Sequence, residues 1–134
     1  MEKINKINDF LTEAKTFYIV SVDGEKPKAR PISFKMIEEG KLWFGVGTFK
    51  DVYKQLEKNN HVEVIANVGS KWMRYDGITH FVLDRDDLEE KAFSLLPGIG
   101  KMYKENGWKM GLFYIENAHV EFKNVMNTED SFDL

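Results

Sequence analysis

Cysteine is absent from the 134-residue chain. Disulfides, thiolate metal centres, iron–sulfur clusters and cysteine nucleophiles are therefore excluded. An excess of basic residues is missing as well, because 19 Lys and Arg stand against 22 Asp and Glu. The resulting net charge of −3 argues against nucleic acid as the main partner, since neutralising a phosphate backbone requires a basic surface.

Long apolar runs are also lacking. No run approaches the roughly 18 residues that a membrane-spanning helix requires. The polar residues 1–6 lack the apolar centre of a signal peptide. We therefore expect a cytoplasmic protein without membrane association. The histidines at 61, 80 and 119 do not have the spacing of metal ligands, so we expect no metal site.

What the chain does contain is enough apolar material for a core. Hydrophobic residues make up 43% of the sequence, and 134 residues fit a single domain spanning 1–134. The aromatic fraction of 13% is high. Aromatic side chains favour strands and also line cofactor pockets, so this feature alone does not separate the two roles.

The hydrophobic periodicity predicts a short chain rich in strands. Strands are expected over residues 17–22, 28–37, 42–46, 61–68 and 72–83, the last bent near Gly77, with a closing hairpin of 109–115 and 119–125 around residues 116–118. Helices are expected over 2–15 and 49–59, and from an acidic start at 84–87 to an end or kink at 97–100, with a further helical turn over 101–106. The acidic tail, 127–134, is expected to be mobile.

These patterns predict a mainly β fold. Six or seven antiparallel strands with hairpin connections in so short a chain favour closing the sheet into a β-barrel with flanking helices. The alternating β-α-β pattern of a doubly wound fold is not present.

The first candidate site is the segment Gly45–Asp51, where a predicted strand runs into a helix. Thr48 is a natural N-cap, and Asp51 three residues later resembles a capping box. With two glycines before the helix and Lys50 on its first turn, the free backbone N–H groups would form an anion cradle. The alternative is that Thr48 only caps the helix and Lys50 is only solvated.

The second candidate site surrounds Pro31, which cannot donate a hydrogen bond within a strand. This position indicates an edge, a bulge or a face lined by a cofactor, and it leaves Arg30 and Ser33 free to point at a ligand. Arg30 and Lys35 would face opposite sides of a regular strand. The alternative for Arg30 is an ion pair with a surface acid.

Taken in order, several segments resemble the pyridoxamine 5′-phosphate oxidase-like family of flavin-binding split barrels, and in size the chain resembles its small nitroimidazole reductase-like members. The segments that carry this resemblance are Phe17–Gly24, Lys28–Ile32, Leu42–Phe44, Thr48–Leu56 and Asn59–Val64.

The resemblance implies a homodimeric split barrel with flavin mononucleotide (FMN) at each subunit interface. Arg30, Lys50 and Thr48 would hold the FMN phosphate. The backbone of Pro31, Ile32 and Ser33 would follow the isoalloxazine ring. Val46 and Gly47 would lie near the ribityl chain, and Trp108 would approach the flavin from the partner subunit.

The function expected from this resemblance is a flavin-dependent oxidoreductase acting on an unidentified small molecule. Vitamin B6 oxidation is not expected, because the phosphate-gripping Tyr, Arg and Ser set of that enzyme is missing between Gly69 and Gly107 and the C-terminus is acidic. Three alternatives stay open: a non-catalytic flavin-binding or sensing protein, the same barrel with deazaflavin or haem, and a lipocalin-like carrier of apolar ligands.

Overall fold

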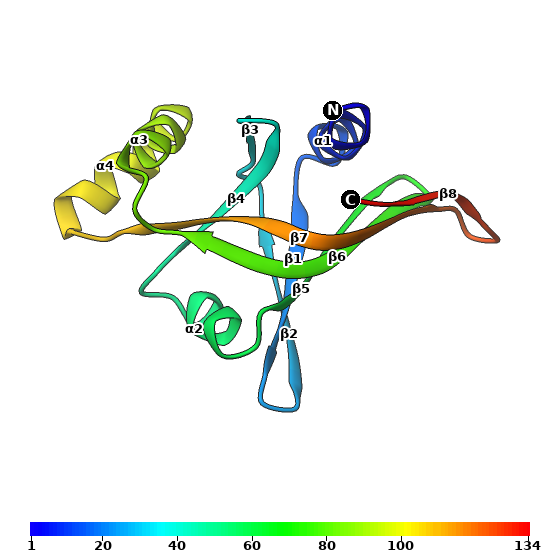
Figure 1. Ribbon diagram of the computed structural model, residues 1–134, viewed down its shortest axis with the longest axis horizontal. Coiled ribbons are helices and arrows are strands. Elements are labelled where there is room, and N and C mark those ends of the chain that lie inside the picture. Colours follow the sequence, from blue (N-terminus) through cyan, green and yellow to red (C-terminus); the bar gives the residue numbers. More distant parts are fainter.

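The computed structural model describes residues 1–134 and is built around an antiparallel sheet of eight strands (Figure 1). Neighbouring strands follow the order β2-β1-β5-β6-β7-β4-β3, and β8 pairs with β7 off this path. The elements are α1 (Glu2–Ala14), β1 (Phe17–Asp23), β2 (Lys26–Ile32), β3 (Met36–Glu38), β4 (Lys41–Gly47), α2 (Asp51–Lys58), β5 (His61–Val68), β6 (Lys71–Val82), α3 (Asp86–Leu95), α4 (Pro97–Asn106), β7 (Met110–Lys123) and β8 (Thr128–Asp133).

The sheet folds back on itself as a split barrel, as the sequence predicts. Side chains alternate along β1, so that Phe17 and Ile19 are fully buried whereas Tyr18 between them is exposed. The rings of Phe17 on β1 and Phe44 on β4 have centroids 5.7 Å apart. These two strands are not neighbours in the sheet, so their contact crosses the barrel interior.

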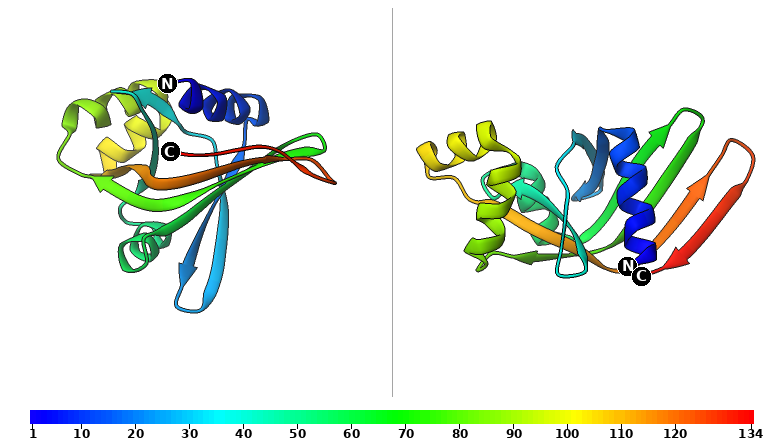
Figure 2. Two further views of the ribbon diagram at one scale, coloured as in Figure 1. Left: turned by 45° about the vertical axis from the view of Figure 1, so that its right-hand side comes forward. Right: turned by 90° about the horizontal axis from the view of Figure 1, so that it is seen from above.

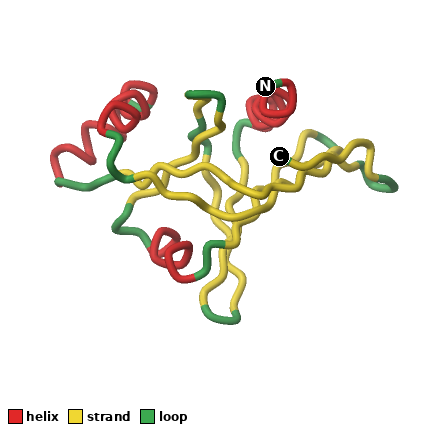
Figure 3. Tube along the Cα trace, viewed as in Figure 1, coloured by secondary structure: helices red, strands yellow, loops and turns green.

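The strands form the middle of the molecule, and the helices lie around them (Figure 3). Helices α1 and α2 lie on opposite sides of the arch formed by β6 and β7 (Figures 1 and 2). Leu11 of α1 and Leu56 of α2 are both buried in the main core. Helices α3 and α4 pack on β4 and β7 around a second core that includes Trp43, Phe93 and Tyr103. No helix is both long and apolar enough to span a membrane.

Strand β6 bends at Gly77, as the sequence predicts, and its register with β7 shifts there. A Cβ at Gly77 would lie 2.5 Å from the Glu116 carbonyl oxygen, so only glycine permits this approach of the two backbones. The closing hairpin predicted around residues 116–118 is wrong, because β7 continues through them. Asn117 has φ 49°, and its turn-like surroundings mark a bulge opposite Gly77 rather than a strand end.

The C-terminal tail is ordered, so the expectation of a mobile segment is also wrong. It forms β8, which raises the strand count to eight. The Phe132 ring lies 6.0 Å from that of Phe122 on β7. Lys6 of α1 forms an ion pair with Asp130, which places the two ends of the chain together (Figure 2). Phe132 is the one aromatic residue in this acidic segment, and the acidic composition concealed the strand that it anchors.

Two further boundaries differ from expectation. The predicted strand 28–37 divides into β2 and β3, because the chain leaves the sheet over residues 33–35. Pro97 begins α4 instead of ending or kinking α3. Proline suits this first helical position, since its missing N–H would have no intrahelical partner there.

Candidate functional site

The guanidinium of Arg30 joins three elements of the fold. Its Nη1 donates to the Ile19 carbonyl oxygen at 3.2 Å and to Ser21 Oγ at 2.8 Å, both on β1. Its Nη2 donates to Gln55 Oε1 on α2 at 2.9 Å. Ser21 Oγ donates to the same oxygen at 2.5 Å. We call Ser21, Arg30 and Gln55 the Arg30 cluster.

Strand register explains why Arg30 points toward the barrel. Arg30 lies opposite Ile19 in the β1–β2 hairpin, and directly paired residues of antiparallel strands share a face. Ile19 is fully buried, and Ser21 two residues later is 1% exposed. The hairpin that sets this register turns at Gly24, whose φ of 64° favours glycine.

The charge of Arg30 is not neutralised by a carboxylate. All its hydrogen-bond acceptors are neutral oxygens, and it forms no ion pair. Partial burial lowers the pKa of Arg30 from its usual value, and the nearby charge of Asp51 opposes this shift. The sequence alternative of a surface ion pair is therefore wrong. Asp51 begins α2, so the start of this helix lies on the side of Arg30.

The start of α2 differs from the predicted capping box. Lys50, not Thr48, is the N-cap residue, and no side chain caps the helix. A turn precedes the helix, closed by the Lys50 N–H donating to the Gly47 carbonyl at 3.0 Å. The first backbone N–H groups of α2 therefore have no side-chain acceptor. The exposed ammonium of Lys50 lies 6.0 Å from the centre of the Phe49 ring.

An aromatic stack flanks this turn. The rings of Phe49 and Trp108 lie 4.3 Å apart at 28°, and Tyr103 meets both rings edge-on. The Thr48 N–H donates to the Lys109 carbonyl at 2.9 Å, which fixes the two segments together. The structure thus places Trp108 beside Thr48 of its own chain. Its approach to a partner's flavin stays a prediction.

The remaining predicted residues form two separate groups. Pro31 and Ser33 are exposed and Ile32 is half-buried, at the end of β2. Val46 and Gly47 are buried at the end of β4. Strand pairing does not bring the two groups together, because β2 and β4 are not neighbours in the strand order.

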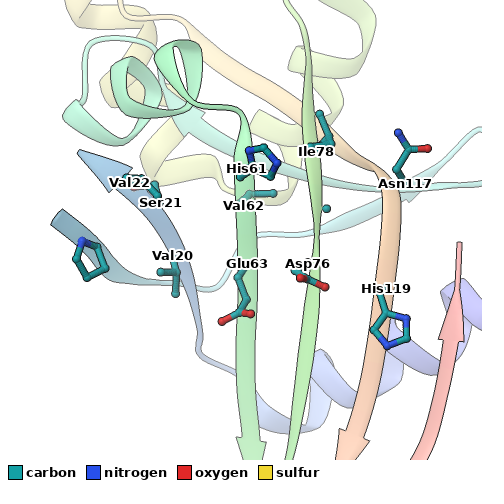
Figure 4. Close-up of a pocket in the computed structure, with 12 residues that line it drawn as sticks. Val20, Ser21, Val22, His61, Val62, Glu63, Asp76, Ile78, Asn117 and His119 are labelled. Carbon is teal, nitrogen blue, oxygen red and sulfur yellow. The ribbon is translucent and has the colours of Figure 1, made fainter. Parts of the chain in front are cut away.

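Two cavities flank the Arg30 cluster. One, of about 540 Å³, opens where β1 separates from β5 and reaches Ser21 (Figure 4). Glu63 and Asp76 stand opposite each other on neighbouring strands in its wall. Burial is the main cause that raises the pKa of Glu63. This cavity is therefore unfavourable for an anion.

The other cavity, of about 970 Å³, lies between α2 and the β1–β2 hairpin. Gln55 of the Arg30 cluster lines it, together with Lys54 and Lys58 and with the acidic residues Asp23, Asp51 and Glu57. Its acidic residues outnumber its lysines, and neither Arg30 nor Lys50 belongs to its lining. The groups that could hold an anion are therefore Arg30, Lys50 and the first turn of α2 rather than the walls of either cavity.

Sequence reasoning missed Ser21 and Gln55. Ser21 carried a usable signal, because it follows Phe17 and Ile19 at the inward positions of β1, where a hydroxyl must find a partner. Gln55 carried none, since its contact with Arg30 depends on how α2 packs against β1.

No curated protein sequence matches the chain, whereas several solved structures resemble it. A NimC/NimA family protein from Clostridium acetobutylicum is 24% identical with a TM-score of 0.87, over 99% of this chain and 93% of that chain. An FAD-binding protein from Mesorhizobium loti is 14% identical with a TM-score of 0.63, over 90% and 94%. A haem-binding protein from Mycobacterium smegmatis is 11% identical with a TM-score of 0.68, over 92% and 55%. At these identities the likeness concerns the fold.

A match to a sequence family identifies the family to which the chain belongs, which the likeness in fold does not. It covers residues 4–109, which include most of α1, all of α2 to α4, strands β1 to β6 and every residue of the Arg30 cluster. The chain belongs to the pyridoxamine 5′-phosphate oxidase family.

Proposed function

We propose that this chain binds FMN and acts as a flavin-dependent oxidoreductase on a small molecule. The observation that carries the proposal is the Arg30 cluster: a half-buried guanidinium held by neutral oxygens, facing the start of α2. A phosphate monoester carries a charge of about −1.5 to −2 at neutral pH. Charged donors such as Arg and Lys form its strongest hydrogen bonds.

The donor set at this position fits a phosphate monoester. Arg30 uses three hydrogen bonds within the chain and keeps two of its five N–H groups. Lys50 contributes an exposed ammonium, and the first turn of α2 contributes backbone N–H groups. In this proposal Thr48 adds its hydroxyl to the same phosphate.

The remaining predicted residues would position the rest of the cofactor. The backbone over Pro31–Ser33 would follow the ring, and Val46 and Gly47 would border the ribityl chain. Bound flavin supplies the electron transfer. The chain's own task is to hold the phosphate, orient the ring and limit access of water, which requires no acid–base residue from the chain.

We further propose a homodimer that closes the flavin site. The outward face of the β1–β2 hairpin supports it, because Tyr18, Val20 and Val22 lie opposite Pro31, Ala29 and Pro27. All six are exposed or half-exposed apolar residues, and a second copy of the chain is the occupant that would bury them. Sedimentation at micromolar concentration is expected to show a dimer, and a flavin-loaded monomer would contradict this step.

The absorbance spectrum of the protein as purified tests the cofactor. FMN binding predicts flavin bands and release of FMN on denaturation. A Soret band would indicate haem, and release of FAD or of a deazaflavin would identify that molecule as the cofactor in place of FMN. A chain that takes up none of these molecules in titration would refute the proposal. Stopped-flow mixing with NADH and NADPH then tests catalysis, since a flavin that no donor reduces favours a non-catalytic binding protein.

A further inference from the structure

The two terminal nitrogens of the Arg30 guanidinium donate to acceptors that carry no charge. The Ile19 carbonyl, the Ser21 hydroxyl and the Gln55 amide oxygen accept from Nη1 and Nη2 at 2.8 to 3.2 Å. Of the five N–H donors of an arginine, the Nε–H and one Nη2–H remain without an acceptor. Such neighbouring donors match the oxygens of a phosphate.

The two side chains that hold Arg30 are themselves fixed. Ser21 is 1% exposed, and its hydroxyl both accepts from Arg30 and donates to Gln55. Gln55 Oε1 receives two donors. Because a guanidinium has no acceptor, the amide oxygen must face Arg30 and the amide nitrogen must point away. The cluster therefore has one arrangement of its donors and acceptors.

Neutral partners are not what a purely structural tie between α2 and β1 would require. A carboxylate at position 55 would accept the same hydrogen bonds more strongly, because charge-assisted bonds exceed neutral ones. It would also cancel the charge that Arg30 offers to a ligand. The carboxylate that acts on Arg30, that of Asp51, forms no hydrogen bond or ion pair with it.

We infer that Ser21 and Gln55 are positioning residues that present the free N–H groups of Arg30, with its full charge, to a phosphate monoester. They thereby make the chain select FMN over riboflavin, which has the same ring and no phosphate. This inference rests on the proposed FMN binding and adds to it the source of the preference for the phosphorylated cofactor.

The decisive variant is Gln55→Glu, which keeps the shape and the acceptor oxygen but adds a charge. FMN and riboflavin are titrated against wild type and variant by quenching of flavin fluorescence. We expect FMN to bind about tenfold more weakly, equal to about 1.4 kcal/mol, while the affinity for riboflavin changes less than about twofold. Asn60→Asp, which adds the same charge at an exposed position just beyond α2, is expected to change neither affinity by more than about twofold.

Ser21→Ala provides a second variant, because it removes one acceptor of Arg30 without adding charge. It is expected to weaken FMN binding several-fold and to spare riboflavin. If Ser21→Ala does not fold, Gln55→Glu alone decides. A wild type that prefers FMN, together with a Gln55→Glu variant that keeps the full preference, would overturn the inference and leave FMN binding intact. A wild type that binds FMN and riboflavin equally would also overturn the inference, and a wild type that binds no FMN would overturn the proposed function with it.

Discussion

Replacing Arg30 by alanine removes the cation on which the proposed phosphate site depends. The two N–H groups that Arg30 does not use within the chain are the ones available to a phosphate. Hydrogen bonds to charged groups contribute about 1.5–3 kcal/mol each. Arg30 is only half-buried, and solvent weakens its interactions. We therefore expect a total loss of about 1.5–3 kcal/mol, or roughly 10- to 150-fold in the dissociation constant for FMN.

The same substitution also affects stability, and the two effects are separable. Ser21 and Gln55 would keep their bond to each other but lose their shared donor, which costs about 1–2 kcal/mol of unfolding free energy. Titration with FMN at a temperature well below the melting transition isolates the binding effect. Lys26→Ala is the control, because it removes an exposed lysine from the tip of the same strand.

Lys50→Ala should weaken FMN binding in the same way, without the loss of stability. Its ammonium forms no ion pair with the chain and lies only at the edge of cation–π range from the Phe49 ring, at 6.0 Å, so the bound phosphate is the main partner that would be lost. If both Arg30→Ala and Lys50→Ala weaken FMN binding by less than about twofold, the assignment of the phosphate site is refuted.

Three further predictions concern charge, packing and pH. Asp51→Asn should tighten FMN binding by about two- to fivefold, because it removes the carboxylate whose charge acts on Arg30; weaker binding in the same titration would count against the electrostatic argument. Gly77→Ala should lower the unfolding free energy by about 1–3 kcal/mol in urea melts, because its Cβ would meet backbone atoms of β7, whereas Gly98→Ala, with nothing within 4 Å, should not; equal effects would refute this. The hydrogen bond to Asp133 raises the pKa of His119 above 6.5, so this contact stabilises β8 most below that pH and less as pH rises through the raised pKa. Amide exchange of β8 at pH 6 and 8, corrected for intrinsic rates, should show weaker protection at pH 8 in the wild type. A decrease in protection of the same size in His119→Gln would contradict this prediction.

Much of the fold could be predicted from local patterns. The alternation in β1 and β5 and the helical spacing in α1 each depend on neighbouring residues, and these elements form within a residue or two of their predicted bounds. Gly77 was recognisable as a bend because glycine within a strand marks a close approach of backbones.

The errors arise where tertiary contacts override local signals. Residues 116–118 have the composition of a turn, but pairing with β6 keeps β7 continuous through them. Residues 128–133 have the composition of a mobile tail, but the contact of Phe132 with Phe122 and the ion pair of Asp130 hold them in place. Neither partner is near in sequence, so no local window contains the cause.

The candidate site divides in the same way. Arg30 and Lys50 could be selected from their own segments, because a proline in a strand and glycines before a helix are local features. The prediction of Thr48 as the N-cap is wrong, because the turn closed by the Lys50 N–H delays the start of the helix to Asp51. Gln55 could not be found, because only the packing of α2 brings it to Arg30.

A structure determined from crystals grown with excess FMN tests the central claim most directly. The account predicts density for the phosphate within hydrogen-bond distance of Arg30, on the side of Lys50 and the first turn of α2. Phosphate bound elsewhere on the chain, or an Arg30 cluster that contacts only protein while the flavin is held at a different place, would contradict it.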